Sequence, residues 1–264
     1  MSGVIVVKYG GSAMEDPAKV SEILQEIAGL AKEGFRMVLV HGGGKEISGE
    51  MSRRGLKAVF SEGFRVTDEA AMAVVEEVLD QRVNPGIVKR LNEFGGRSSG
   101  ISGRKVFHAK KAPKAGGVDL GRVGEVERCE VTEVRRCLEA KETAVVSPVG
   151  QGNDGGAMNL NADVAAAALA GALQAERMIF LSDVPGLMKN VKDPNSLIQE
   201  IRADELQKLE QEGVIGGGMI PKCRSAVSAL RQGLKKVEFV DGRVGGNLSK
   251  AARGQVTVGT SMAL

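Results

Sequence analysis

The feature that most restricts the fold of this chain is a repeated pattern of a Val/Ile-rich run, one or more glycines and an amphipathic helix. The runs predicted to be buried strands are residues 4–7, 37–40, 143–147, 178–181 and 237–240. Helices are predicted over residues 17–31, around Ile47 and Met51, and over 67–79, 163–175, 204–212 and 219–232. Because strands that alternate with helices require right-handed crossovers, the pattern predicts an α/β fold with a largely parallel sheet covered on both faces.

The chain divides into two predicted lobes. Its 264 residues exceed a typical domain length of roughly 150 residues, which allows one large α/β domain or two closely packed lobes. Residues 105–128 are rich in glycine and alternate in polarity, so β-hairpins are predicted there. We place the boundary near Ala175, which gives an N-terminal lobe of residues 1–175 with the hairpins and a plainer lobe of residues 176–264.

Composition excludes several classes of function. The net charge of +3 is small and aromatic residues make up 3% without any tryptophan, so a nucleic-acid-binding protein is not expected. The longest apolar stretch, residues 164–175, is shorter than the roughly 20 residues of a membrane-spanning helix, and no signal peptide is evident. Cys129, Cys137 and Cys223 form no Cys-x-x-Cys pair and are predicted to be free thiols in a reducing cytoplasm.

Three glycine-rich loops follow predicted strands: Gly10-Gly11, residues 42–44 and residues 150–156. Loops at the carboxyl ends of parallel strands are common ligand sites, because glycine lets successive backbone N–H groups point at one anion. Each loop could also be a tight turn that needs glycine only for its backbone conformation. The third loop matches the spacing of a dinucleotide-binding loop, but a single match is weak, and Asp154 would lie against a pyrophosphate.

Two lysines lie beside glycine-rich segments. Lys8 ends an apolar strand directly before Gly10, where it could meet a phosphate or extend into solvent at the sheet edge. Lys222 follows Pro221 at the predicted opening of a helix, where a cation is slightly unfavourable unless it serves a ligand. The chain has only two histidines, His41 and His108, which gives a histidine base little support.

Six motifs then occur in a characteristic order: VKYGGSAM at 7–14, VHGGG at 40–44, GFRVTD at 63–68, MNLNAD at 158–163, LSDVPG at 181–186 and GMIPK at 218–222. With this order the chain resembles the acetylglutamate kinases of the amino-acid kinase superfamily over nearly its whole length. The resemblance implies a three-layer αβα sandwich around one twisted sheet, with β-hairpins in the N-terminal lobe. It also implies that the N-terminal lobe holds the amino acid and forms a homodimer, and that the C-terminal lobe holds ATP.

The resemblance further implies a reaction, the transfer of the γ-phosphoryl group of ATP to the side-chain carboxylate of N-acetyl-L-glutamate in arginine biosynthesis. The catalytic residues would be Lys8, Lys222 and Asp163. The substrate-binding residues would be Gly43, Gly44, Arg65 and Asn159. The nucleotide-binding residues would be Gly10, Gly11, Ser182, Asp183, Gly186, Gly217, Gly218 and Met219. Mg²⁺ would arrive on the ATP phosphates, since no carboxylate cluster for a metal is evident in the sequence.

The chain departs from the family pattern in two places. Residues 102–105 read Ser-Gly-Arg-Lys where relatives often have Ser-Gly-Lys-Asp-Gly, which leaves the preference for substrate chain length open. Residues 245–248 lack the His and Glu of arginine-inhibited relatives, and Lys8 lies too near the start for their extra N-terminal helix, so we expect an arginine-insensitive homodimer. Two alternatives stay open: a kinase for N-blocked α-aminoadipate in lysine biosynthesis, and a catalytically silent metabolite-binding homologue.

Overall fold

A twisted central sheet runs through the whole molecule. The computed structural model describes residues 3–11, 16–190, 193–216, 218–255 and 259–264. In spatial order the strands of this sheet are β12 (Glu200–Arg202), β14 (Gly259–Ala263), β13 (Val237–Asp241), β11 (Arg177–Ser182), β1 (Val4–Tyr9), β2 (Arg36–His41), β8 (Thr143–Val146) and β5 (Ser98–Ile101). Neighbouring strands are parallel except β13 and β14, so the prediction of a largely parallel sheet is confirmed.

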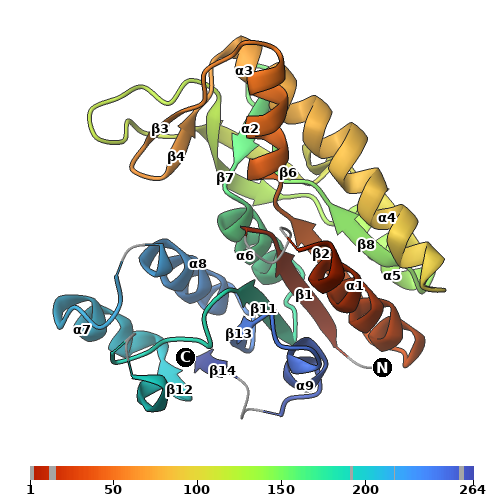
Figure 1. Cartoon of the computed structure of the whole chain (residues 1–264), viewed down its shortest axis with the longest axis vertical. Coiled ribbons are helices and arrows are strands. Elements are labelled where there is room, and N and C mark those ends of the chain that lie inside the picture. Colours follow the sequence, from red (N-terminus) through yellow and green to blue (C-terminus); the bar gives the residue numbers. More distant parts are fainter. Residues whose placement is uncertain (1–2, 12–15, 191–192, 217, 256–258) are drawn as a thin grey trace.

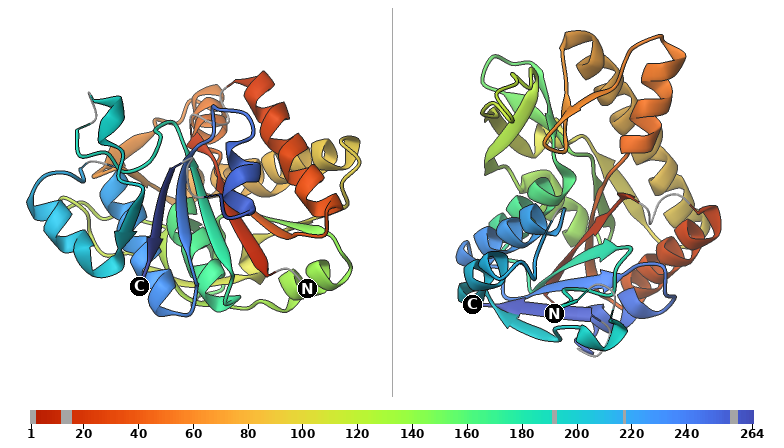
Figure 2. Two further views of the ribbon diagram at one scale, coloured as in Figure 1. Left: turned by 90° about the horizontal axis from the view of Figure 1, so that it is seen from below. Right: turned by 60° about the vertical axis from the view of Figure 1, so that its left-hand side comes forward.

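Helices cover both faces of this sheet (Figure 2). The α-helices are α1 (Pro17–Lys32), α2 (Gly44–Arg53), α3 (Glu69–Glu76), α4 (Asn84–Glu93), α5 (Thr132–Glu139), α6 (Ala162–Ala172), α7 (Leu206–Gln211), α8 (Met219–Arg231) and α9 (Asn247–Ala252). Short 3₁₀-helices are η3 (Gly103–Lys105), η4 (Pro194–Ser196) and η5 (Ala203–Glu205).

Strand β1 shows why the sheet needs helices on both sides. Its side chains alternate, so that Val4 and Val6 pack into a core with α5, α6 and α8. Ile5 and Val7 pack on the opposite face into a core with α1, α4 and α9. A strand that is apolar on both faces must be covered on both, and the three-layer αβα sandwich follows.

The middle of the chain forms a second, smaller β-structure. The strands β6 (Phe107–Lys111), β7 (Val123–Cys129), β9 (Val149–Gly152) and β10 (Ala157–Leu160) close into a barrel, and β3 (Val59–Ser61) pairs with β4 (Phe64–Val66). The antiparallel pair β6–β7 confirms a hairpin within residues 105–128. Figure 1 shows the barrel, β3–β4 and helices α2 to α4 in the upper half of the molecule, with α7, α8 and α9 below.

The glycine loop at residues 150–156 does not join a strand to a helix. Gly150 and Gly152 lie within β9, and the residues that follow turn back into the antiparallel strand β10. The turn takes Gly155 at a φ of +81°, a left-handed conformation that favours glycine. Of the two interpretations left open for this loop, the structure shows the tight turn, and the dinucleotide-like spacing belongs to a β-hairpin.

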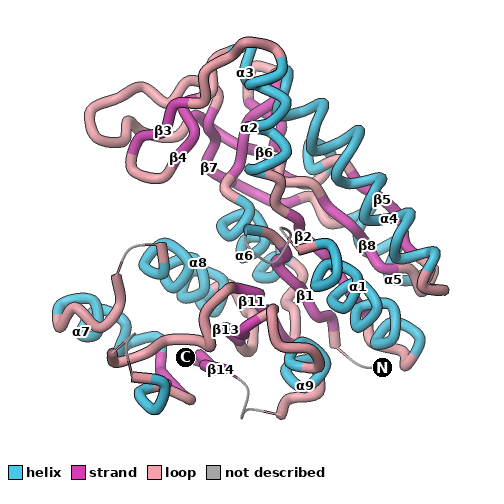
Figure 3. Tube along the Cα trace, in the orientation of Figure 1, coloured by secondary structure: helices cyan, strands magenta, loops and turns pink. Residues whose placement is uncertain are grey.

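A π-helix interrupts the helix predicted over residues 67–79. Asp68 caps the helix by accepting from the Ala71 N–H at 2.8 Å, and α3 passes into the π-helix η2 (Glu77–Val83) and then into α4. The three elements form one continuous coil in Figure 3. Pro85 explains the interruption, because proline has no N–H and its ring would collide with the carbonyl one turn earlier in an α-helix.

The boundary near Ala175 falls between α6 and β11, and the division into lobes of residues 1–175 and 176–264 stays a prediction. The central sheet takes strands from both of these lobes. Within the part of the chain that the structure describes, no helix is both long and apolar enough to cross a bilayer.

Candidate active site

Three charged side chains from separate elements meet at the carboxyl end of β1. Lys8 lies in this strand between the neighbouring strands β2 and β11. Asp163 lies in the first turn of α6, and its backbone N–H donates to the N-cap Asn161 Oδ1 at 2.9 Å. Lys8 Nζ lies 3.0 Å from Asp163 Oδ1, and Lys222 Nζ from α8 donates to Oδ2 of the same carboxylate. The fold thus brings together the three residues that the motifs predict to be catalytic.

Burial and charge both act on this cluster. Burial lowers the pKa of Lys8 below its ordinary 10.5; the Asp163 carboxylate partly opposes this effect, and the Lys222 cation adds to it. Burial alone would raise the pKa of Asp163, but the two lysines outweigh burial and hold it below its ordinary 3.8. Two ammonium groups that share one carboxylate leave an excess positive charge, which suits an incoming anion.

Two glycine loops border the cluster. A Cβ on Gly10 would lie 3.0 Å from both Cα and N of Gly42, so the loops after β1 and β2 pack backbone against backbone. Gly43 is the N-cap of α2 and offers no side-chain cap. The backbone N–H groups of Gly43 and Gly44 have no acceptor among the described residues. Free N–H groups at a helix N-terminus are what an anion site requires.

A cavity of about 190 Å³ opens beside these loops. It is lined by residues 42–44 and Ile47 from the start of α2, Phe60, Phe64 and Arg65 from the β3–β4 hairpin, and Asn159 and Asn161 from the chain around β10. All four residues predicted to bind the substrate (Gly43, Gly44, Arg65 and Asn159) line it.

Arg65 is buried at the wall of this cavity. Its Nη2 donates to Gly44 O at 3.0 Å and to Ser48 Oγ at 2.8 Å, and its Cζ lies 4.7 Å from the ring centre of Phe60. Burial lowers the pKa of the Arg65 guanidinium, yet so strong a base stays charged. Of its five N–H groups, Nε–H and one on Nη1 have no described acceptor, so they can still donate to an anion.

Asn159 is held through a buried hydroxyl. Its Nδ2 donates to Thr67 Oγ1 at 3.0 Å, and that hydroxyl donates to Arg65 O at 2.7 Å. Because the amide nitrogen is turned to Thr67, the carbonyl oxygen Oδ1 is left for other partners. Thr67 thereby ties the two predicted substrate-binding residues to each other.

None of the described residues predicted to bind the nucleotide lines this cavity; they follow β1, lie at or after the end of β11, or lie at the start of α8. Ser182 ends β11 and donates from Oγ to Val184 O at 3.0 Å, while Asp183 beside it is exposed. A Cβ on Gly186 would lie 2.5 Å from Thr260 Oγ1, so this position needs glycine.

The other predicted nucleotide residues are glycines and one methionine. Gly218 is the N-cap of α8 and Met219 its first residue, whereas Gly217 lies outside the described residues. Helix α8 begins at Met219, as predicted, and Lys222 lies in its first turn. Gly11 has a φ of +67°, and no described atom lies within 4 Å of a Cβ built there.

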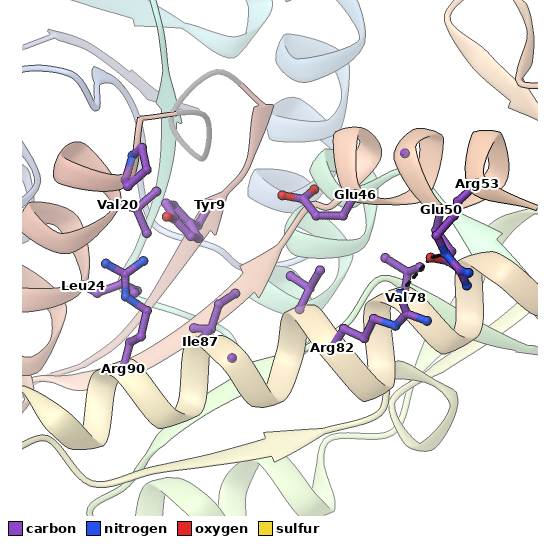
Figure 4. A pocket seen from close by; sticks show the side chains of 14 residues that line it. Tyr9, Val20, Leu24, Glu46, Glu50, Arg53, Val78, Arg82, Ile87 and Arg90 are labelled. Atoms are coloured by element: carbon purple, nitrogen blue, oxygen red, sulfur yellow. Dashed lines mark hydrogen bonds and ion pairs between the residues drawn. The ribbon is translucent and has the colours of Figure 1, made fainter.

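No group of three or more His, Cys, Asp or Glu side chains that could hold a metal ion occurs within the ranges that the structure describes. A second cavity, of about 590 Å³, lies between α1, α2 and η2–α4 and shares no lining residue with the first (Figure 4). There the buried Glu50 carboxylate accepts from Arg53, Arg54 and Arg82, which holds its pKa well below the usual range and fastens α2 to η2.

Known proteins resemble this chain over most of its length. The model of the amino acid kinase family matches residues 3–241. The acetylglutamate kinase of Akkermansia muciniphila is 41% identical over 244 residues, which cover 90% of this chain and 82% of that protein. The acetylglutamate kinase of Syntrophomonas wolfei is 40% identical over 240 residues, or 91% of this chain and 84% of that protein. The chain belongs to the amino acid kinase family. The resemblance to acetylglutamate kinases predicted from the motifs is confirmed.

Solved structures confirm the amino acid kinase fold. The N-acetylglutamate synthase from Neisseria gonorrhoeae, in complex with coenzyme A and N-acetyl-glutamate, superposes with a TM-score of 0.82 at 24% identity. The match covers 99% of this chain and 59% of that chain. At this identity the match concerns the fold alone.

Three residues that contact Arg65 or Asn159 were not among those predicted for this amino acid kinase. Thr67 lies two positions after Arg65 in the same motif, and Ser48 lies one helical turn after Gly44, so spacing could have found both. Phe60 could not have been found by spacing. It reaches Arg65 only because it is the register partner of Arg65 in the β3–β4 hairpin, which the sequence did not predict.

Proposed function

We propose that this chain transfers the γ-phosphoryl group of ATP to the side-chain carboxylate of N-acetyl-L-glutamate, forming an acyl phosphate. The proposal rests above all on one observation: Lys8 and Lys222, 214 positions apart, contact the same Asp163 carboxylate beside a cavity that contains Arg65. The 41% identity to an acetylglutamate kinase names the substrate.

The reaction asks for little proton chemistry. A carboxyl group of pKa about 4.3 is already ionised at neutral pH, so the nucleophile needs no general base. A carboxylate oxygen forms a bond to the γ-phosphorus while the bond from that phosphorus to the β,γ-bridging oxygen breaks, and ADP leaves with the electron pair. The difficulty is to hold two mutually repelling anions in line and to neutralise the charge of the transferred group.

The residues at the end of β1 suit that task. In the proposed mechanism Lys8 and Lys222 stabilise the phosphoryl group, and Asp163 keeps both ammonium groups in position. The N–H groups of Gly44 and Gly11 add hydrogen bonds to the phosphoryl oxygens. Gly43 and Gly44 close over the end of the substrate where the acyl phosphate forms.

Arg65 and Asn159 are proposed to bind the rest of the acid. The buried Arg65 guanidinium suits the α-carboxylate, because it is positively charged and its N–H groups on Nε and Nη1 that have no described acceptor can donate to an anion. Asn159 faces the N-acetyl amide and the carboxylate with its carboxamide. In this proposal the amino acid binds to the lobe of residues 1–175.

The nucleotide is proposed to bind as its Mg²⁺ complex to the lobe of residues 176–264. Ser182, Asp183, Gly186 and residues 217–219 would surround it, and Gly10 with Gly11 would approach its phosphates. The substrate phosphates would hold the ion, and its charge would shield theirs. This chain's own residues then supply only the ammonium and N–H groups.

We also propose a homodimer and a cytoplasmic location. Strand β5 is an edge of the central sheet within the described residues, and an open edge is a ready site for pairing with a second copy. The cytoplasmic location rests on three cysteines, all free in the structure.

Trapping the acyl phosphate with hydroxylamine tests the proposed function. We expect a hydroxamate with N-acetyl-L-glutamate and MgATP, and less with N-acetyl-α-aminoadipate or unblocked glutamate. A higher rate with the aminoadipate would assign the chain to the longer substrate, and ATP binding without any hydroxamate would indicate a silent homologue.

A matched pair of variants makes that test specific. Lys222→Met should lower kcat by about 10²–10³, the usual effect of losing one preorganised donor to a charged transition state. Lys89→Met, which removes an exposed lysine on α4, should leave kcat unchanged.

A further inference from the structure

His41 is a buried imidazole that the proposed mechanism does not use. It ends β2, directly before the glycine loop, and it has no solvent-exposed surface. Its Nδ1 lies 2.7 Å from the carbonyl oxygen of Gly42, and its Nε2 lies 3.2 Å from Asn84 Nδ2. A fully buried histidine with a partner on each nitrogen has a defined orientation.

The partners also define which nitrogen carries the proton. Asn84 Nδ2 donates a second bond to Val145 O at 3.0 Å, which fixes the amide nitrogen, and not Oδ1, at this position. An amide nitrogen can only donate, so Nε2 of His41 must accept and Nδ1 must carry the hydrogen that binds Gly42 O. Burial lowers the pKa of His41 to about 4, although its bond to Gly42 opposes the effect, so the ring is neutral at physiological pH.

The hydrogen bond from His41 to Gly42 O also orients the N–H at the other side of the Gly42–Gly43 peptide. In a trans peptide the C=O and the following N–H point in opposite directions, and no cis peptide occurs among the described residues. With Gly42 O held by the imidazole, the N–H of Gly43 is turned away from the ring. Gly43 lines the cavity of the candidate active site, and its N–H has no acceptor among the described residues. The preceding peptide is fixed as well, by the bond from Gly42 N to Tyr9 O at 2.7 Å.

The π-helix supplies the rest of the support. Asn84 is the first residue after η2 and is buried where α4 passes β8. Within η2, Asp80 accepts from Ser102 Oγ at 2.6 Å and from Ser147 Oγ, which fixes η2 to the ends of β5 and β8. Leu79 packs behind Gly43, where a Cβ would lie 2.5 Å from Leu79 Cδ2. One irregular helix thus contacts the glycine loop directly and through His41.

We propose that His41 and Asn84 are positioning residues: the imidazole, protonated on Nδ1 and held by the Asn84 carboxamide, fixes the Gly42–Gly43 peptide so that the Gly43 N–H faces the transferred phosphoryl group. This inference rests on the proposed phosphoryl transfer. It assigns a role to a histidine that neither donates nor accepts a proton in the reaction. The alternative is a histidine that merely fills the core.

Nitrogen NMR tests the first half of this proposal without any substrate. The chain has two histidines, so a His108→Gln variant assigns the signals of His41. We expect a protonated Nδ1 and an unprotonated Nε2 that do not titrate across the neutral pH range. The Nε2–H tautomer, or titration near neutral pH, would overturn the proposal.

Kinetics of matched variants test the second half. His41→Asn keeps a donor near the position of Nδ1 and should retain kcat within a few-fold. His41→Phe keeps the ring volume without either nitrogen and should lower kcat by about 10- to 100-fold, since the Gly43 donor is misplaced in the transition state, with little change in either KM. Asn84→Ala should lower kcat in the same way, whereas Asn153→Ala, in the exposed β9–β10 turn, should not.

The outcomes separate this inference from the proposed function. If the wild-type protein forms no hydroxamate, the proposed function is wrong, and the role proposed for His41 is wrong with it. Active wild-type protein whose His41→Phe and Asn84→Ala variants keep full kcat would overturn the positioning role alone. If His41→Phe fails to fold, Asn84→Ala and the tautomer of His41 decide the question.

Discussion

Lys8 shows how burial changes what a single side chain can do. In water it would titrate near 10.5, but burial in the end of β1 lowers its pKa, and only the Asp163 carboxylate opposes that effect. The lowered pKa of Asp163 has a consequence for stability: the benefit of its ionised form is complete above pH 3.8 and is lost only as the pH falls through the lower native value. The site therefore keeps its carboxylate through the neutral range.

The pKa of Lys8 predicts the alkaline limit of activity. As the pH rises through a native pKa below 10.5, Lys8 loses the charge that is proposed to neutralise the phosphoryl group, so kcat should fall. An arginine keeps its charge at such pH values, so in Lys8→Arg the residual kcat should lose this alkaline decline. A pH profile of kcat for both proteins checks the prediction, and an identical decline in the variant would contradict it.

Arg65 predicts the specificity for the acid. Lysine has one ammonium group in place of the five N–H groups of the guanidinium, so Arg65→Lys should raise KM for N-acetyl-L-glutamate by about 10-fold or more, as the loss of a charge-assisted bond implies. KM for ATP should stay unchanged, because Arg65 lines the cavity proposed to bind N-acetyl-L-glutamate and is not among the residues proposed to bind the nucleotide. Steady-state kinetics with each substrate varied in turn decide between these cases. Equal rises in both KM values would indicate a general loss of structure.

At the scale of secondary structure, the loops after β1 and β2 depend on each other. Gly10 and Gly42 touch through their backbones, where a side chain would have to push main-chain atoms aside. Glycine in α1 is different, since nothing lies within 4 Å of a Cβ built on Gly29. The two glycines therefore form a matched pair for mutation.

Gly10→Ala should destabilise the protein by about 1–3 kcal/mol, the usual effect of overpacking, and should lower kcat by displacing the loops. Gly29→Ala should stabilise it by about 0.5–1 kcal/mol, because alanine replaces glycine within a helix. Denaturant unfolding of both variants measures these differences. A neutral Gly10→Ala would show that the two loops can separate without loss.

Predicted and observed elements differ where tertiary contacts select a structure that the local sequence pattern does not specify. The apolar spacing of residues 67–79 predicts a helix correctly, but not its passage through a π-helix, which Pro85 and the buried contacts of Asn84 impose together. The glycines of residues 150–156 satisfy a loop and a hairpin equally well, and only pairing with the rest of the barrel selects the hairpin.

For the whole molecule, the proposed homodimer gives a direct prediction. Sedimentation should give twice the chain mass of 27.7 kDa, because the open edge at β5 and the N-terminal lobe around it are proposed to pair. The same mass is expected with and without arginine. A monomer at micromolar concentration, or a larger assembly, would count against the proposal.

Sequence alone determined the alternation of strands and helices, because a Val/Ile-rich run bounded by glycine is typical of a buried strand. The order of the six motifs determined the family. It also named Lys8, Asp163 and Lys222, but only by resemblance. Tertiary structure decided that these three side chains meet, that Phe60 stacks on Arg65 and that His41 faces both Gly42 and Asn84. Local spacing cannot give such contacts, since each joins segments whose distance depends on crossovers, strand register and the closing of a barrel.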